Sequence, residues 1–239
     1  MEGYIVAAGN YCMEEFGTVH VTVRRTARTI RARWKGARLE VSVPTGIAAS
    51  EVLSALRAFA PRMYAAKPPR MYSPGDSLVF PEVTVHIDSR DDSPSKISYE
   101  IEGSDWHVRV GKAWDFDSHD TMLAISDSIC RMARRAAPSI LLPYAAEVAE
   151  EIGVSPIMWS VSNGHRVLGH CSARREIALS YVLIFLPERL RRFIICHELA
   201  HLSEMNHSAR FHALCDAYLG GCEAELKAEL KAFRFPFIR

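Results

Sequence analysis

The chain has 239 residues, of which 49% are hydrophobic and 24% charged, as in an ordinary globular protein of one large domain or two small ones. Its net charge of +1 excludes a global attraction to nucleic acid or to an anionic membrane. No apolar run reaches the roughly 18 residues of a transmembrane helix, and the first residues do not resemble a signal peptide. We therefore expect no membrane partner.

Strands are the first predicted elements, because residues 18–43 alternate apolar and polar side chains. Lys35-Gly36 predicts a hairpin turn inside this segment. A helix is expected from Ser50, which can cap its first turn, and we expect Pro61 to end or kink that helix. A linker at 67–70 and strands at 83–87, 97–101 and 106–110 complete this part of the chain.

Helices dominate from about residue 118. Apolar residues at helical spacing form a stripe up to Met132 and continue after Pro138 and Pro143, and Gly153 suits the end of this helical region. Beyond it, short strands are expected on both sides of Asn163-Gly164, a strong hairpin signal. These strands are placed at 157–161 and 166–168, with a further strand at 177–185. We detect no internal repeat.

The most informative segment is the pentapeptide from His197 to His201, His-Glu-Leu-Ala-His, which is followed by His207. Two histidines four apart on a helix project from one face, so both imidazoles can reach one zinc ion at about 2.0–2.1 Å. Glu198 lies beside the first histidine and can take a proton from a zinc-bound water without being a ligand. The pattern predicts a hydrolytic zinc site with its own general base.

His207 is the favoured third zinc ligand, because it follows the helix directly. A continuing helix would point it about 240° away from His201, so the chain must turn first. Asn206 is the residue there that best tolerates a left-handed conformation. Ser208 can then cap a new helix over 209–219. A glutamate from a later helix is the open alternative, either Glu223 or Glu225.

The segment from His197 to Phe211 closely resembles the YgjP-like metallopeptidase family, a relative of the SprT-like and Wss1-like zincins. Leu168-Gly169-His170-Cys171-Ser172 is similar to the strand motif of that family, with leucine replacing its tryptophan and His170 replacing a serine. The resemblance extends over 120–152 and, more weakly, over 24–44. It implies a zinc-dependent hydrolase with a zincin fold and does not specify a substrate.

Together these elements predict an α+β protein. Residues 1–115 are expected to form a β-rich N-terminal region with one helix. Residues 116–239 are expected to form a zincin-like domain of helices, a small antiparallel sheet and the active-site helix. An edge strand of that sheet would let a peptide substrate dock by strand addition.

Two further groups of residues bear on compartment and partners. Six scattered cysteines, none at a metal-binding or redox spacing, predict reduced thiols in a cytoplasmic protein. Cys171 has no feature of a nucleophile, and we favour a structural or surface role for His170. The segment Arg24–Arg38 holds seven basic residues and no acid. We favour a solvated hairpin face there over a nucleic-acid interface.

We favour a zinc metallopeptidase that cleaves a peptide or protein substrate with water activated by Glu198. One alternative is a nucleic-acid-associated binding module with a structural zinc, and another is a zincin-fold hydrolase of non-peptide bonds such as phosphoanhydrides. Glu198 argues against the binding module, because a structural site needs no base and closes with a fourth protein ligand. His212 and Tyr218 are candidates for stabilising the oxyanion.

Overall fold

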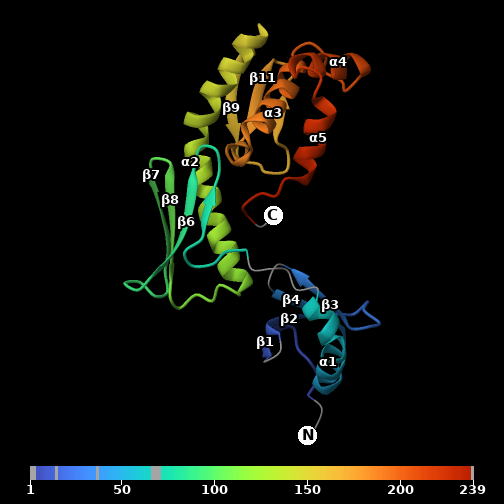
Figure 1. The fold of residues 1–239 in the computed structure, drawn as a ribbon. Coiled ribbons are helices and arrows are strands. Elements are labelled where there is room, and N and C mark those ends of the chain that lie inside the picture. Colours follow the sequence, from blue (N-terminus) through green and yellow to red (C-terminus); the bar gives the residue numbers. More distant parts are fainter. Residues whose placement is uncertain (1–3, 14–15, 36–37, 66–70, 238–239) are drawn as a thin grey trace. The chain divides into compact units, whose positions relative to one another are not determined.

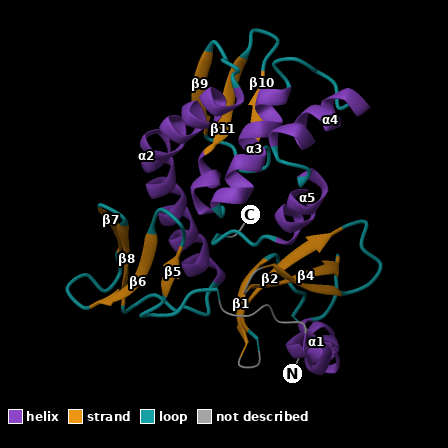
Figure 2. Cartoon of the chain, turned by 45° about the horizontal axis from the view of Figure 1, so that its top comes forward, coloured by secondary structure: helices purple, strands orange, loops and turns teal. Residues whose placement is uncertain are grey.

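The structure of the protein is a computed structural model that describes every residue except 1–3, 14–15, 36–37, 66–70 and 238–239. The predicted linker and Gly36 of the predicted turn lie outside the described residues. The architecture is α+β, as the sequence predicts (Figures 1 and 2). The chain divides into two compact units: unit 1 comprises residues 1–73 and 112–124, and unit 2 comprises residues 74–111 and 125–239.

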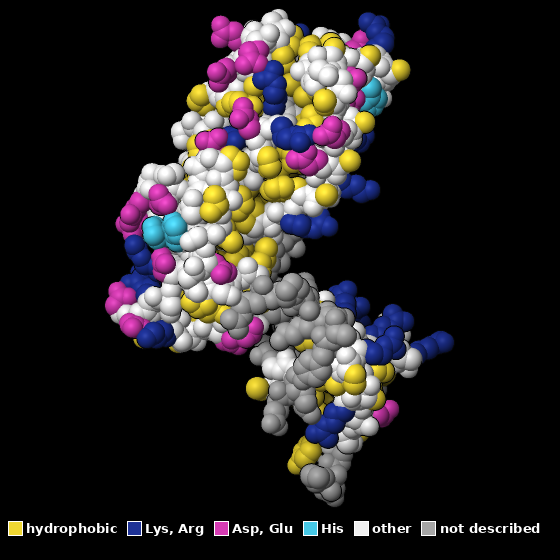
Figure 3. Space-filling model, viewed as in Figure 1, with side chains coloured by type: hydrophobic (Ala, Val, Ile, Leu, Met, Phe, Trp, Pro, Cys, Tyr) yellow, Lys and Arg dark blue, Asp and Glu magenta, His cyan; other side chains and the backbone are white. Residues whose placement is uncertain are grey.

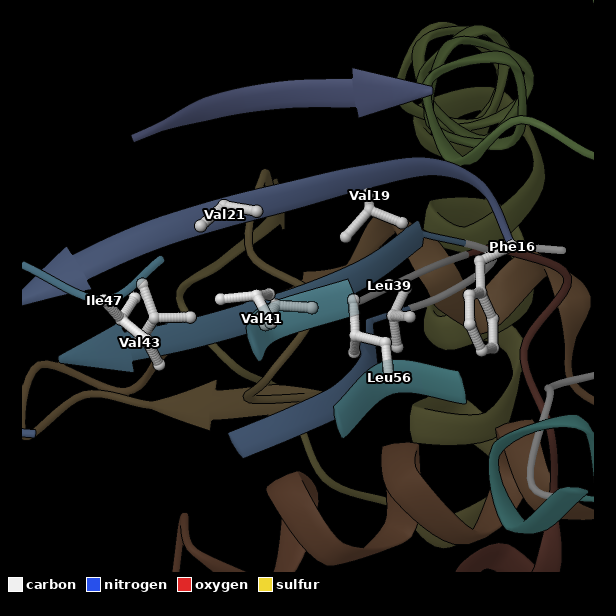
Figure 4. Packing of buried hydrophobic residues seen from close by; sticks show 9 residues of the cluster. Phe16, Val19, Val21, Leu39, Val41, Val43, Ile47 and Leu56 are labelled. Carbon is white, nitrogen blue, oxygen red and sulfur yellow. The ribbon is translucent and has the colours of Figure 1, made fainter. Parts of the chain in front are cut away.

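Unit 1 is built on a four-stranded sheet and one helix. In spatial order the strands are β1 (Gly9–Met13), β2 (Gly17–Arg24), β4 (Arg38–Pro44) and β3 (Arg31–Lys35), and the helix is α1 (Ala49–Ala65). β2 and β4 run parallel, whereas the outer pairs are antiparallel. Alternate side chains such as Val19 and Val41 point into a core that Leu56 of α1 helps to fill (Figure 4).

Unit 2 contains a second four-stranded sheet that repeats the topology of the first. In spatial order its strands are β5 (Ser77–Val79), β6 (Thr84–Arg90), β8 (Asp105–Gly111) and β7 (Ile97–Glu102). The central pair is again parallel and the outer pairs antiparallel. The register matches too, because His20 lies opposite Glu40 in the first sheet and His86 lies opposite His107 in the second. The sequence analysis missed this repeat.

Interior prolines do not end α1 or α2 (His119–Ile152), so of the two effects expected at Pro61 the structure excludes the end of the helix. α1 continues through Pro61, and α2 is a single helix of 34 residues through Pro138 and Pro143. An interior proline costs a helix about 3 kcal/mol. Fully buried side chains continue at helical spacing past both prolines of α2, at Ile129, Met132, Ala133, Ala137, Leu141, Ala145 and Val148. Their burial outweighs that cost, and α2 ends at Gly153 as predicted, where φ is +78°.

A third, smaller sheet belongs to the helical half of unit 2. Its order is β10 (Gly169–Cys171), β11 (Glu176–Ser180) and β9 (Met158–Ser162). The hairpin predicted at Asn163-Gly164 is wrong, because β11 lies between the two expected partners, parallel to β9 and antiparallel to β10. The sheet is therefore mixed rather than antiparallel.

The predicted strand at 177–185 is correct only in its first half. β11 ends at Ser180, whose side chain accepts a hydrogen bond from the Val182 N–H, and residues 181–185 form a 3-10 helix. All five side chains of that helix are buried. A segment that is buried on every side has no apolar-polar alternation, so its periodicity did not distinguish strand from helix.

Aromatic packing explains why residues 74–111 belong to unit 2. Phe185 of the 3-10 helix contacts Phe80 and Trp106 of this segment, with ring centroids 5.0 and 6.5 Å apart. The division therefore differs from the boundary at residue 115 that the sequence analysis expected, which separates these rings. Among the described residues, no helix combines the length and apolar character needed to cross a bilayer.

Candidate metal centre

The predicted metal-binding segment forms α3 (Glu188–Ala200), a helix that is buried nearly all round. Pro187 precedes it, and the Pro187 carbonyl accepts hydrogen bonds from the N–H groups of Leu190 and Arg191 at 2.9 and 3.0 Å. Its buried apolar residues are Leu190, Phe193, Ile194, Ile195, Cys196, Leu199 and Ala200. Because burial of an unpartnered polar group is costly, each polar side chain on α3 needs a partner or a function.

Arg191 anchors α3 within unit 2. Its side chain is only 2% exposed, and it forms an ion pair of 2.9 Å with Glu82, in the segment between β5 and β6. The guanidinium also lies over the Tyr144 ring of α2, 5.2 Å from its centroid. Glu82 itself is 42% exposed, but its removal would leave the buried Arg191 charge unpaired, which is destabilising, so this contact helps to fix the position of α3.

The structure brings the three predicted ligands together. Ring nitrogens of His197, His201 and His207 all lie within 4.8 Å of one another. The Nε2 atoms of His197 and His207 are 3.1 Å apart. Tetrahedral ligands at about 2.0–2.1 Å from one zinc ion lie roughly 3.3 Å apart. Three imidazoles at this spacing form a donor set that suits zinc and leaves a coordination position open.

The protonation of the histidines also suits a metal. His201 Nδ1 lies 3.1 Å from the Glu204 carbonyl oxygen, and an Nδ1–H that donates there leaves Nε2 for a metal. Burial, together with the neighbouring histidines, lowers the pKa of His197 to about 4. Burial also lowers the pKa of His201. These two imidazoles are therefore neutral at physiological pH, which is the form that binds a metal.

A short turn returns His207 to α3. Asn206 does not adopt the left-handed conformation that we expected, because Arg175 is the only non-glycine residue with a positive φ among those that the structure describes. Instead, the Ser208 N–H donates to the Asn206 carbonyl at 2.7 Å. The Ser208 side chain then caps α4 (Ala209–Tyr218) as predicted, accepting a hydrogen bond from the Phe211 N–H.

Phe211 is the packing centre of the histidine cluster. Its ring is fully buried, and its centroid lies 4.9, 4.5 and 4.7 Å from those of His197, His201 and His207. One aromatic ring thus touches all three imidazoles and limits their rotation. Packing of this kind fixes the orientation of side chains, which is how catalytic sites are preorganised.

Glu198 points toward strand β10. A Cβ atom on Gly169 would lie 2.5 Å from Glu198 Oε1 and 2.6 Å from its Cγ, so only glycine leaves room for this carboxylate. Glu198 is 5% exposed, and no hydrogen-bond partner for it is found among the described residues. Burial raises the pKa of Glu198 to about 7. Such a carboxyl group is poised to exchange a proton near neutral pH.

The two alternative ligands have other partners. Glu223, on α5 (Glu223–Ala232), lies 2.8 Å from His212 Nδ1, and Glu225 forms an ion pair of 2.5 Å with Arg189. A cavity of about 230 Å³ lies beside the histidine cluster, and both His212 and Glu223 line it. Of the two oxyanion candidates, His212 therefore faces this cavity, whereas Tyr218 packs against the core around Phe211.

The remaining residues near the site do not join the histidine cluster. His170 is exposed on β10, and Cys171 is buried. Burial raises the pKa of the Cys171 thiol, and the Glu198 charge adds to this, so the thiol is no activated nucleophile. All six cysteines are free.

Sequence reasoning missed the structural roles of Gly169, Phe211 and Arg191. An isolated glycine in a strand is a known sign of a close approach by another group, so Gly169 carried a signal that was not used. Phe211 and Arg191 carried none, because their roles depend on contacts between elements that are distant in sequence.

Comparisons with known proteins were made at the level of sequence and of fold. The family profile described as YgjP-like, metallopeptidase domain, matches residues 28–233. No curated protein matches the chain. The metallopeptidase zymogen abylysin of Pyrococcus abyssi is 19% identical, with a TM-score of 0.35 over 39% of this chain and 93% of that chain. The zymogen jannalysin of Methanocaldococcus jannaschii is 21% identical, with a TM-score of 0.31 over 37% and 93%.

We predict that Gly169→Ala destabilises the metal-free protein by about 1–3 kcal/mol, as overpacking typically does. The added methyl group must displace the Glu198 carboxylate. In a Glu198→Ala background that carboxylate is gone, so the same substitution should cost almost nothing. Urea unfolding of the four proteins in this double-mutant cycle measures the coupling. An equal cost in both backgrounds would show that the two side chains do not meet.

We also predict a pH-dependent stability difference between the metal-free protein and its Glu198→Gln variant. The pKa of Glu198 is raised from 4.5 to about 7, so the folded state holds a proton that the unfolded state releases between these values. Stability therefore falls as pH rises through this window, by about 3 kcal/mol relative to the variant. Urea unfolding from pH 4.5 to 8 tests this, and a constant difference would contradict it.

Proposed function

Since the chain belongs to the YgjP-like metallopeptidase family, we propose that it is a zinc-dependent peptidase with Glu198 as its general base. The proposed metal ligands are His197, His201 and His207. The observation that carries the proposal is the convergence of three imidazoles beside a buried carboxylate that is not one of the ligands. A structural zinc site has no use for such a carboxylate.

The chemistry divides between the metal and the chain's own residues. A zinc ion held by the three histidines would act as a Lewis acid that polarises the scissile carbonyl and acidifies water. Glu198 accepts the proton of the attacking water and delivers it to the leaving amine. Its contact with Gly169 holds the carboxylate in place for both transfers. Phe211 keeps the imidazoles in position, so little reorganisation is needed.

Strand β10 offers a means of orienting a peptide. It is an edge strand of its sheet, because β11 is its single partner in the part of the chain that the structure describes, and it carries the glycine that contacts Glu198. An extended peptide that adds to this edge gains main-chain hydrogen bonds and passes close to the general base. Side chains of such a peptide could enter the cavity lined by His212 and Glu223.

We predict that His207→Ala loses zinc, whereas Glu223→Ala retains it. His207 supplies one of three converging nitrogens, but Glu223 is already paired with His212. Elemental analysis by mass spectrometry, on proteins purified without chelator, measures the zinc content of each variant. Full zinc retention in His207→Ala, with loss in Glu223→Ala, would move the third ligand to the later helix.

We predict that Glu198→Gln keeps its zinc and its fold but loses hydrolysis by about 10²–10⁴-fold, the usual cost of removing a general base. Digestion of an unbiased peptide library, followed by mass spectrometry, measures the activity. Glu225→Gln is the matched control, because this carboxylate pairs with Arg189 outside the histidine cluster. If the protein hydrolysed a phosphoanhydride but no peptide, the proposed peptidase function would be wrong, and the alternative of a non-peptide hydrolase would be correct.

A further inference from the structure

The described arginines of the segment Arg24–Arg38 are exposed, in line with the solvated face that we expected, and several of them also line a groove. Within unit 1, β2, β3, β4 and the β2–β3 connection enclose a groove of about 800 Å³. The groove lies on the face of the sheet opposite the buried core, because the core residues Val19, Val21 and Val41 alternate with the residues that line it. Its lining contains four arginines, namely Arg24, Arg28, Arg31 and Arg33.

Three of these arginines have no counter-charge among the residues that the structure describes. Glu40 is the one acid that lines the groove, and it accepts a hydrogen bond from Arg33 at 3.0 Å. Among the described residues, Arg24, Arg28 and Arg31 form no ion pair, and each is exposed. Like charges gathered in a concave site raise the local potential, so the groove attracts anions.

The second sheet provides a comparison within the same chain. By strand register, Arg33 of β3 corresponds to Glu100 of β7, and Ser42 of β4 corresponds to Arg109 of β8. On the second sheet, Arg109 pairs with Glu100 at 2.5 Å. The same face also holds two His–Asp pairs of 2.9 Å, His86–Asp105 and His107–Asp88.

The two copies of one topology therefore differ in how their charges are balanced. The polar face of the second sheet pairs its arginine and histidines with carboxylates of the same sheet, whereas that of the first leaves three guanidinium groups open to solvent. Figure 3 shows basic side chains gathered on unit 1, whereas acidic, basic and histidine side chains are intermixed over the second sheet. This sheet topology can pair its charged side chains internally, as the second sheet does. The unpaired arginines of the first sheet therefore point to an anion from outside the protein.

The chemistry of the lining identifies the kind of anion. Guanidinium groups bind phosphate through two parallel hydrogen bonds, and hydroxyl groups donate to phosphate oxygens. The hydroxyls here come from Thr22, Thr26, Thr29 and Ser42. The described lining holds no aromatic side chain on which a base could stack, and stacking is the main device of single-strand binders. Several phosphate-binding groups in one groove suit a ligand with a row of phosphates. Because bases have nothing to stack on here, a duplex, whose bases are already stacked, fits better than a single strand.

We infer that this groove binds duplex nucleic acid through its phosphate backbone, with Arg24, Arg28 and Arg31 as the main contacts. Each neutralised phosphate contributes about −0.9 to the slope of log affinity against log salt. Three contacts therefore predict an affinity loss of about 40-fold between 50 and 200 mM salt. The binding does not depend on the zinc site, so it stands or falls independently of the proposed peptidase activity.

The test uses the full-length protein and a fluorescein-labelled 20-base-pair DNA duplex of random sequence, with binding followed by fluorescence anisotropy at both salt concentrations. In the double variant Arg28→Gln, Arg31→Gln, one of the three contacts remains, so the salt-dependent loss should shrink to about 3–4-fold. The matched control is Arg57→Gln, Arg62→Gln, which removes the same charge from α1 on the core side of the sheet. This control should keep the wild-type salt dependence.

Several outcomes would overturn the inference. Equal salt dependence in the two double variants would show that binding reflects total charge rather than the groove. Poly-glutamate that displaces the duplex at equal charge concentration would identify an acidic peptide as the ligand instead. Binding to vesicles with 30% phosphatidylserine, without duplex binding, would identify a lipid surface. Circular dichroism and the thermal unfolding midpoint verify that each variant is folded before binding is measured.

Discussion

The burial of α3 on nearly all sides is the constraint from which the candidate site follows. An apolar environment makes each polar side chain on this helix costly unless it is paired or used. Arg191 meets that requirement in part, with Glu82 and the Tyr144 ring, while its buried Nε has no hydrogen-bond partner among the described residues; the histidines meet it with each other and with Phe211. Glu198 remains, and burial alone raises its pKa to about 7. The environment that packs α3 thus also makes its glutamate a base suited to neutral pH.

The parts of this site that the sequence predicted are those governed by short-range geometry. The spacing of His197 and His201 follows from the helical repeat, and the Ser208 cap follows from its own hydroxyl. The parts that it did not predict depend on contacts between distant segments. Asn163-Gly164 has the local chemistry of a hairpin, yet β11 occupies the position between β9 and β10. The free energy that a favourable turn sequence contributes is small compared with that gained by burying a central strand.

The prolines of α2 and the repeated sheet both show that local sequence signals do not determine the fold where burial decides it. Pro138 and Pro143 carry strong helix-breaking signals, but a continuous buried stripe outweighs them. The two four-stranded sheets share topology and register, yet their equivalent polar positions differ in charge, as Arg33 and Glu100 do. Burial fixed the apolar positions in both copies, whereas the solvent-facing positions were free to diverge. The repeat can therefore be recognised from the strand order of the structure, but not from similarity between the two stretches of sequence.

The groove of unit 1 and the site on α3 differ in how strongly solvent ions screen their charges. Charges in the groove of unit 1 are exposed, so ions screen them within a Debye length of about 8 Å at physiological ionic strength. Glu198 is buried and His197 is half-buried, so such screening is weaker there and neighbouring groups set the pKa values. Raising the salt concentration should therefore weaken an interaction at the groove while leaving the chemistry at α3 nearly unchanged. A salt effect on substrate capture without an effect on turnover of a short neutral peptide would locate recognition and catalysis on different surfaces of the protein.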